Sequence, residues 1–165
     1  MAKVTLRGQA FNTSGELPKA GQKAPDFSLR KNDLTSTTLK DYDGFNVILN
    51  IFPSIDTATC AMSVRQFNER ASKLENTKVI CVSRDLPFAQ KRFCGAEGIQ
   101  NVITASDFAT GDFGRSYGVE LLDGPMHALH ARAVVVIGTN GIVKYTELVT
   151  EIANEPNYDA AIAAL

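Results

Sequence analysis

The stretch Val47-Ile48-Leu49-Asn50-Ile51-Phe52, followed at once by Pro53-Ser54-Ile55-Asp56-Thr57-Ala58-Thr59-Cys60, decides the fold that we predict for this chain. The first six residues are almost all apolar, which is typical of a strand buried inside a sheet. Residues 59–75 then follow a helical pattern of apolar positions. Cys60 is therefore predicted to lie one turn into a helix, just after a loop that leaves a buried strand.

This position gives the thiol of Cys60 a distinct chemistry. The N–H groups of a first helical turn have no partner inside the helix and carry partial positive charge. They favour a thiolate over a thiol, and the thiolate is the reactive form of cysteine. The alternative is a cysteine that only packs among apolar side chains, which is common. The polar residues that precede Cys60 favour the reactive form.

Further strands and helices alternate on both sides of this stretch. Gly8 separates two short strand patterns that predict a hairpin, and Asn140-Gly141 predicts a tight turn between two late strands. Pro87 suits the first position of a helix that Gly95 or Gly98 can end. The predicted strands are 4–7, 9–12, 26–30, 46–52, 77–83, 101–104, 132–137 and 142–148. One further predicted helix starts at residue 87, and two others cover residues 112–117 and 157–165. Residues 13–26 are predicted to form a loop.

This order of elements predicts an α/β fold. Early strands separated by helices imply parallel crossovers, and the late hairpin adds antiparallel strands. We expect a mixed central sheet with helices on both faces and an N-terminal hairpin extension. The order matches a thioredoxin-like fold, although periodicity alone also permits other α/β sandwiches. No linker or repeat interrupts the chain, so we expect one domain over residues 1–165.

Composition narrows the possible functions. Hydrophobic residues make up 44% and charged residues 21% of the 165 residues, as in an ordinary globular protein. The net charge is −1 without a long basic run, so nucleic acid and an anionic membrane are not expected partners. The N-terminus has no apolar stretch of signal-peptide length, and we expect a cytoplasmic protein. Three scattered cysteines do not form a secreted disulfide framework.

Two of the residues that precede Cys60, Thr57 and Pro53, each have two possible roles. Thr57 is predicted either to cap the helix, with its hydroxyl accepting first-turn N–H groups, or to hydrogen-bond the sulfur and an incoming oxygen. Both roles are compatible. Pro53 either stiffens the loop beside the thiol or only ends the strand.

For the remaining candidate residues, Cys81, His127 and His130, the sequence favours structural roles. Cys81 lies in the middle of a buried strand and is predicted to be a core residue. His127 and His130 do not have the spacing of a metal-ligand pair, so we assign them to a loop and expect no metal. No glycine-rich nucleotide-binding pattern is present, so no bound cofactor is expected.

The residues around Cys60 form a motif that resembles that of a known family. Pro53-x-x-x-Thr57-x-x-Cys60 resembles the peroxidatic motif of peroxiredoxins. Three blocks in order, residues 50–57, 85–98 and 131–137, are similar to the bacterial thiol peroxidase subfamily, whose members are atypical two-cysteine peroxiredoxins. The similarity covers nearly the whole chain.

The resemblance implies a role for each matching position. Cys60 is the peroxidatic nucleophile, Thr57 hydrogen-bonds the thiolate and the peroxide, and Pro53 shields the site. Arg132 holds the thiolate and polarises the O–O bond. Cys94 is the resolving cysteine, which forms an intramolecular disulfide with Cys60 that thioredoxin reduces. The family is dimeric and reduces hydrogen peroxide and organic hydroperoxides as an antioxidant defence.

Without the resemblance, two of these residues have simpler explanations. Arg132 alone is a surface arginine at the start of a strand, and Cys94 alone is a packed helix residue. Two other functions also remain open. A thiol–disulfide oxidoreductase is disfavoured because such enzymes carry C-x-x-C, whereas Thr57 occupies the earlier position here. A peroxide sensor or holdase would use the same pair of cysteines as a switch.

Overall fold

The main sheet has seven strands in the order β4-β3-β7-β6-β5-β8-β9, and the computed structural model describes residues 1–165. Strands β5, β6 and β7 are parallel to one another, while β3, β4, β8 and β9 join antiparallel. The strands are β1 (Lys3–Leu6), β2 (Gln9–Asn12), β3 (Ser28–Lys31), β4 (Ser36–Thr38), β5 (Asn46–Ile51), β6 (Thr77–Ser83), β7 (Ile103–Ser106), β8 (Ala133–Ile137) and β9 (Val143–Leu148). The helices are η1 (Leu39–Tyr42), α1 (Ala58–Ala71), α2 (Pro87–Glu97), α3 (Asp112–Ser116) and α4 (Tyr158–Ala163).

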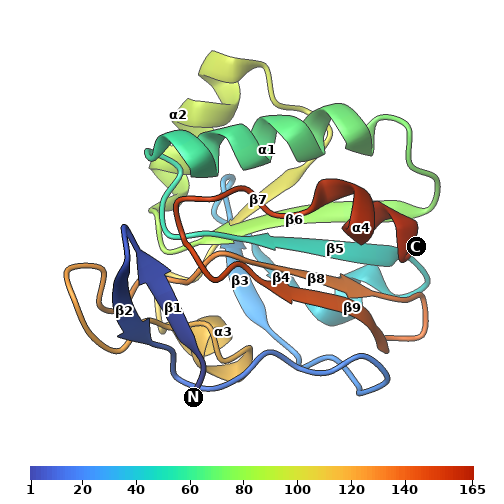
Figure 1. Cartoon of the computed structure of the whole chain (residues 1–165). Helices are drawn as coiled ribbons and strands as arrows, with labels where there is room; N and C mark the ends of the chain where they lie inside the picture. Colours follow the sequence, from blue (N-terminus) through green and yellow to red (C-terminus); the bar gives the residue numbers. More distant parts are fainter.

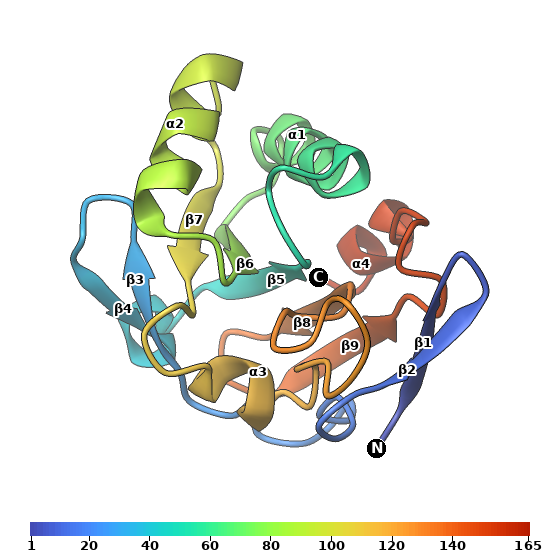
Figure 2. The ribbon, with the colours of Figure 1, turned by 90° about the vertical axis from the view of Figure 1, so that its left-hand side faces the viewer.

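Helices cover both faces of this sheet (Figure 1). Helices α1, α2 and α4 lie on one face, while α3 and the β1–β2 hairpin lie towards the other, as the view turned by 90° also shows (Figure 2). The expected mixed sheet, with helices on both faces and an N-terminal hairpin, is confirmed.

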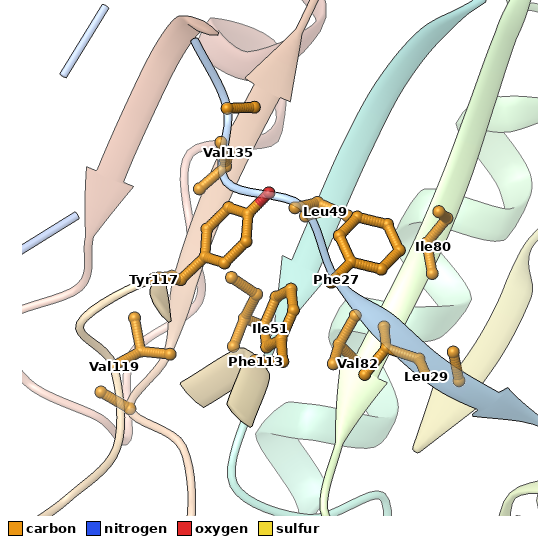
Figure 3. Packing of buried hydrophobic residues seen from close by; sticks show 14 of the residues in the cluster. Phe27, Leu29, Leu49, Ile51, Ile80, Val82, Phe113, Tyr117, Val119 and Val135 are labelled. Atoms are coloured by element: carbon orange, nitrogen blue, oxygen red, sulfur yellow. The ribbon is translucent and has the colours of Figure 1, made fainter. Parts of the chain in front are cut away.

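The alternation of side chains along the strands produces two apolar cores. On one face, Ile48, Cys81 and Val134 pack with side chains of α1, α2 and α4. On the other face, Leu49 and Val135 pack in a cluster that includes the rings of Phe27, Phe113 and Tyr117 (Figure 3). Because each fully buried aliphatic or aromatic side chain contributes roughly 1.5–3 kcal/mol, these two clusters supply the main stabilisation of the sheet.

Several boundaries differ from the sequence predictions. Strand β7 starts at Ile103 rather than at 101, because the backbone N–H of Asn101 donates to Asn68 Oδ1 of α1 at 2.7 Å. Helix α1 ends at Ala71 rather than near 75, and Asn76 then takes a left-handed backbone conformation with φ 48°. Strand β4 and helix η1 were not predicted, because three polar residues and a single helical turn give no clear periodic pattern.

The last two strands are joined as predicted. Gly138 N–H donates to the carbonyl of Ile142 at 2.8 Å, and Gly141 has φ 79°. Asn140 is not in the left-handed region, so only the glycine of Asn140-Gly141 uses the freedom that the turn needs. A register shift lies in β8 at Val136/Ile137, just before the turn. The turn therefore carries a bulge and is not a simple two-residue hairpin.

Candidate active site

Cys60 is the third residue of α1, directly after the loop that leaves β5. Its side chain is fully buried. The structure therefore confirms the predicted strand–loop–helix arrangement around this thiol. The first helical turn has no acidic residue, so no negative side chain offsets the partial charge of its N–H groups.

Thr57 precedes α1 but does not cap it with its side chain. Its backbone is extended, with φ −95° and ψ 148°, as at an N-cap position. Its hydroxyl donates to the carbonyl of Ser54 at 3.2 Å and accepts no N–H group of the first turn. The predicted capping role of this hydroxyl is wrong, since the hydroxyl closes the loop instead. Thr57 is exposed, and its hydroxyl makes no hydrogen bond to the sulfur of Cys60 in this structure.

The carboxylate of Asp85 holds the same loop from the neighbouring strand. Ser54 Oγ donates to Oδ1 at 2.7 Å, and the N–H of Ile55 donates to Oδ2 at 2.7 Å. Ser83, the last residue of β6, adds a hydroxyl at 2.5 Å. This role of Asp85 was not predicted from the sequence. Its position just after a parallel strand next to β5 was the available signal, because such strand ends meet at one edge of a sheet.

Arg132 reaches the thiol from the antiparallel neighbour of β5. Ala133 pairs with Ile51, which brings the residue before β8 to the end of β5. The Nη2 of Arg132 donates to the Cys60 sulfur at 3.3 Å, and Nε donates to the carbonyl of Ile152 at 2.8 Å. The side chain is 1% exposed, so the alternative of a surface arginine is wrong.

The second amino group of Arg132 lacks an acceptor. Nη1 is buried and has no hydrogen-bond partner. Because a buried donor that lacks an acceptor costs about 1–3 kcal/mol, a ligand oxygen at this position would recover that cost. Pro53 is also buried in the loop that precedes α1, while the side chain of Asp56 is exposed. The structure thus brings Cys60 and Arg132 into contact, with Pro53 and Thr57 in the adjoining loop.

Cys94 lies on a different helix and has a different partner. It is half-buried on α2, and its Sγ contacts Thr104 Oγ1 at 3.8 Å. Burial raises the pKa of the Cys94 thiol, and the hydrogen bond to Thr104 opposes this effect only in part. Helices α1 and α2 are also linked by Arg65, which donates to both carboxylate oxygens of Glu97 at 2.9 and 3.0 Å. All three cysteines are free thiols.

Cys81 is the core residue that its sequence context predicts. It is fully buried in β6, where the side-chain amide of Asn50 lies 3.6 Å from its sulfur. Burial raises the pKa of Cys81 to about 12, so its thiol stays protonated at neutral pH. A protonated thiol is a poor nucleophile, so Cys81 is not a candidate nucleophile.

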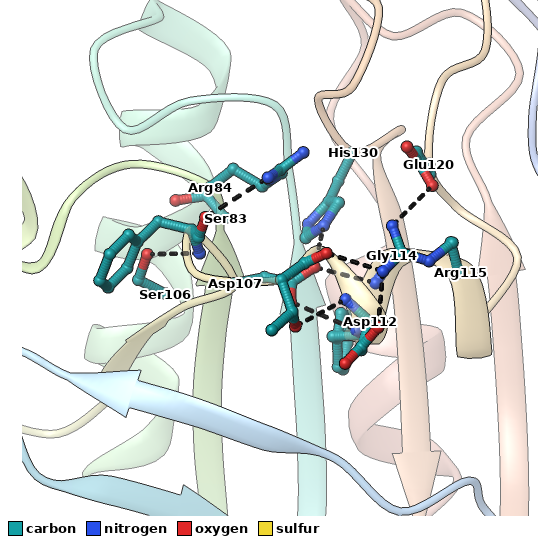
Figure 4. A network of polar contacts seen from close by, with 12 residues as sticks. Ser83, Arg84, Ser106, Asp107, Asp112, Gly114, Arg115, Glu120 and His130 are labelled. Atoms are coloured by element: carbon teal, nitrogen blue, oxygen red, sulfur yellow. Dashed lines mark hydrogen bonds and ion pairs between the residues drawn. The ribbon is translucent and has the colours of Figure 1, made fainter.

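His127 and His130 lie in a loop, as predicted, but His130 is fully buried there. Its Nε2 lies 2.9 Å from Oδ2 of Asp107. The same carboxylate accepts the N–H groups of Phe113 and Gly114 at 3.2 and 3.0 Å, which anchors the start of α3 (Figure 4). No group of three or more histidine, cysteine or acidic side chains is arranged to hold a metal ion. His130 therefore has a structural partner in Asp107.

An open groove of about 380 Å³ lies beside the first turn of α1. Ala58, Thr59 and Met62 line one side, and residues 153–155 line the other. Thr59 Oγ1 donates to the carbonyl of Ala153 at 3.0 Å and so links the two sets of lining residues. A larger hollow of about 460 Å³ near β3 and α3 has none of the residues around Cys60 in its lining. The groove at α1 is therefore the hollow that adjoins the candidate site.

The sheet order and a buried cysteine in the first turn of α1, in contact with an arginine, place the molecule among the thioredoxin-like peroxiredoxins. Comparison with known proteins supports this class. The Redoxin family model matches residues 19–162. A thiol peroxidase from Mycobacterium tuberculosis is 60% identical over 165 residues, covering 100% of this chain and 99% of that protein. A thiol peroxidase from Corynebacterium glutamicum is 52% identical over the same shares of the two chains.

Solved structures agree with this assignment. A peroxiredoxin-like protein from Aquifex aeolicus has a TM-score of 0.93 at 38% identity, with 99% of this chain and 95% of that chain covered. A thiol peroxidase from Chromobacterium violaceum has a TM-score of 0.90 at 19% identity, with 98% and 93% covered, which supports the fold. The chain belongs to the redoxin family and, within its peroxiredoxins, to the bacterial thiol peroxidases. It is a thiol peroxidase, an oxidoreductase that acts on a peroxide and uses a thiol reductant.

The helices of the structure are too short or too polar to cross a bilayer.

Proposed function

We propose that the chain reduces hydrogen peroxide and organic hydroperoxides, both alkyl and lipid, to water and alcohols, with Cys60 as the attacking thiolate. The observation that carries this proposal is the contact of 3.3 Å between Arg132 Nη2 and the Cys60 sulfur inside a buried site. A fixed guanidinium favours negative charge on sulfur, and arginine stays charged at any working pH.

The first step forms an S–O bond and breaks the O–O bond. The thiolate of Cys60 attacks the terminal oxygen of the hydroperoxide, and the electron pair of the O–O bond leaves with the other oxygen. That oxygen takes up a proton and departs as water or alcohol, while Cys60 becomes a sulfenic acid. The unpartnered Nη1 of Arg132 is placed to stabilise the charge that develops on oxygen. Thr57 and Pro53 would form the loop side of this pocket.

The second step restores the enzyme through Cys94. Its thiol condenses with the sulfenic acid of Cys60, which forms a disulfide and releases water. Thioredoxin then reduces the disulfide by thiol–disulfide exchange. In the reduced protein, the sulfurs of Cys60 and Cys94 contact Arg132 and Thr104, respectively. Both sulfurs must leave these partners before a disulfide forms, so helix ends near both cysteines have to open.

The proposed oligomeric state is a homodimer, and the proposed compartment is the cytoplasm. A group of exposed apolar side chains supports self-association, namely Leu86, Phe88 and Phe108, which are 51%, 66% and 38% exposed. They are held on neighbouring segments, because Ser106 Oγ donates to the carbonyl of Asp85 and accepts the N–H of Phe108. Three free thiols, one of them the proposed nucleophile, suit a reducing compartment.

One experiment tests the chemistry. Reduced protein receives one equivalent of hydrogen peroxide, and mass spectrometry maps the linked cysteines; turnover is then followed with thioredoxin, its reductase and NADPH. We expect a Cys60–Cys94 link and continuous turnover in the wild type. Cys60→Ser should abolish peroxide consumption, and Cys94→Ser should consume peroxide once without turnover. Cys81→Ser is the matched control and should behave as the wild type.

Three outcomes would contradict the proposal. An undiminished rate of peroxide consumption in Cys60→Ser would show that Cys60 is not the nucleophile. Normal turnover of Cys94→Ser with thioredoxin would show that Cys94 is not the resolving residue. Slow, stoichiometric oxidation of the wild type, no faster than that of free cysteine, would favour a peroxide sensor instead of a catalyst.

A further inference from the structure

The orientation of Arg132 depends on a main-chain carbonyl. No carboxylate pairs with this guanidinium; its Nε donates to Ile152 O at 2.8 Å and its Nη2 to the Cys60 sulfur at 3.3 Å. Because a guanidinium is planar and rigid, fixing the direction of Nε also fixes the direction of both amino groups. The position of the Ile152 carbonyl therefore sets where Arg132 points.

The segment that carries Ile152 is held by the N-terminal hairpin. The N–H of Ile152 donates to the carbonyl of Thr5 at 2.8 Å, and the N–H of Thr5 donates to the carbonyl of Thr150 at 2.6 Å. These contacts make a short parallel bridge between Thr5 and Glu151. Strand β1 lies beside the segment between β9 and α4 in both ribbon views (Figures 1 and 2).

The side chain of Glu151 joins this segment to the tip of the hairpin. Its carboxylate accepts the hydroxyl of Thr5 at 2.7 Å and the N–H groups of Arg7 and Gly8 at 2.9 and 3.5 Å. It also accepts the N–H of Ala153 at 3.4 Å. Arg7 and Gly8 both have left-handed backbones, with φ 51° and 81°. Successive N–H groups of such a turn converge on an anion, so the turn has the geometry that a carboxylate stabilises.

We propose that Glu151 is a positioning residue for Arg132, and that the N-terminal hairpin thereby belongs to the peroxidase site. Glu151 touches neither the sulfur nor the substrate. It fixes the β1–β2 turn against residues 150–153, which holds the Ile152 carbonyl where Arg132 Nε reaches it. This inference rests on the proposed role of Arg132 beside Cys60. It gives a function to an extension that is not part of the seven-stranded sheet.

The test measures the rate of Cys60 oxidation by hydrogen peroxide in competition with a haem peroxidase. Glu151→Ala should lower the second-order rate constant about tenfold, because small misplacements of a reacting group are costly. Asp123→Asn is the matched control. Asp123 accepts the N–H and the side-chain amide of Asn12 at 3.0 and 2.7 Å, so it also anchors the hairpin, but it does not contact residues 150–153. This control should stay within about twofold of the wild type.

A second measurement, made in an Arg132→Lys variant, distinguishes a positioning role of Glu151 from a general loss of structure. In Arg132→Lys, which lacks the guanidinium, adding Glu151→Ala should change the rate by less than about twofold, since the coupling between the two residues is gone. If Glu151→Ala does not fold, Glu151→Gln, which keeps one acceptor oxygen, takes its place with an expected loss of about threefold.

The outcomes distinguish this inference from the proposed function. An unchanged rate in the Glu151 variant, an equal loss in both Arg132 backgrounds, or an equal loss in Asp123→Asn would overturn the positioning role. A wild-type rate no greater than that of free cysteine would instead contradict the proposed function itself.

Discussion

Arg132 is a buried cation whose direct polar contacts are a sulfur and one carbonyl oxygen. Such a group lowers stability unless its charge is matched, because removing it from water is expensive. The side chain is retained at the end of the central strands, where it contacts the reactive thiol. We infer that arginine is kept at this position for the chemistry proposed for Cys60 rather than for stability.

Replacing Arg132 by Met should separate these two effects. We expect peroxide to oxidise Cys60 about a hundredfold more slowly, since a positioned donor contributes that much to charge stabilisation. The free energy of unfolding should stay within about 1 kcal/mol of the wild type or rise, because Met fills the site without a buried charge. Urea unfolding and competition kinetics measure the two quantities. A loss of stability above this range would mean that Arg132 is mainly structural.

Single residues were predictable from sequence to different degrees. Cys60 followed from its place after an apolar strand, because local periodicity contains that information. Arg132 did not, since its contact with Cys60 arises from the pairing of Ile51 with Ala133, which are far apart in the chain. Only the family resemblance singled it out. The hydroxyl of Thr57 bonds Ser54 rather than the helix, a local choice that residue type alone does not determine.

Helix α2 contains a glycine, which is a poor helix former, next to Cys94. Gly95 lies inside the helix, and a Cβ built there would meet nothing within 4 Å. Gly98 ends the helix in a left-handed conformation with φ 65°. The segment around Cys94 is therefore intrinsically easier to unwind than an alanine-containing helix.

Gly95→Ala should slow formation of the disulfide without slowing the reaction with peroxide. Alanine stabilises a helix interior by about 0.5–1 kcal/mol relative to glycine, so opening α2 around Cys94 should become about two- to fivefold slower. Rapid quenching with a thiol-blocking reagent, followed by mass spectrometry, measures sulfenic acid and disulfide separately. Equal disulfide rates in the two proteins would indicate that α2 does not unwind.

At the scale of elements, long segments with clear periodicity were predicted well. The buried strand at 77–83 was predicted residue for residue, and the helix that begins at Pro87 ends at Gly98, one of the two glycines proposed. Strand β4 and the true start of β7 were missed. Both depend on contacts between elements, such as the pairing of Leu29 with Thr37 and the bond from Asn101 to Asn68.

The whole molecule keeps several weak acids protonated inside its two cores. Burial raises the pKa of Cys81 to about 12 and also raises the pKa of Tyr117, Tyr158 and Cys94. The ordinary values are 9.0 for cysteine and 10.0 for tyrosine. Between the ordinary and the raised values, the unfolded chain loses these protons while the folded protein keeps them.

Stability should therefore be complete below about pH 9 and fall as the pH rises towards 12. Each fully buried group of this kind, such as Cys81, lowers the free energy of unfolding by about 1.4 kcal/mol per pH unit in that range. Urea midpoints at about pH 8 and about pH 10.5, with a reducing agent present, measure the change. Cys81→Ser should show a smaller drop, because one titrating group is removed. Equal midpoints at the two pH values would contradict the prediction.

The route by which the site is assembled has a consequence for the newly made chain. The segments that build the site around Cys60 come from residues 53–57, Asp85, Arg132 and Ile152, which are far apart in the chain. Synthesis runs from the N-terminus at about 5–20 residues per second, and domains fold as units. The sulfur of Cys60 therefore leaves the ribosome without its guanidinium. Under the roles proposed above, it acquires that partner only after 72 further residues have been made, and until then it lacks the cation that favours its reactive form.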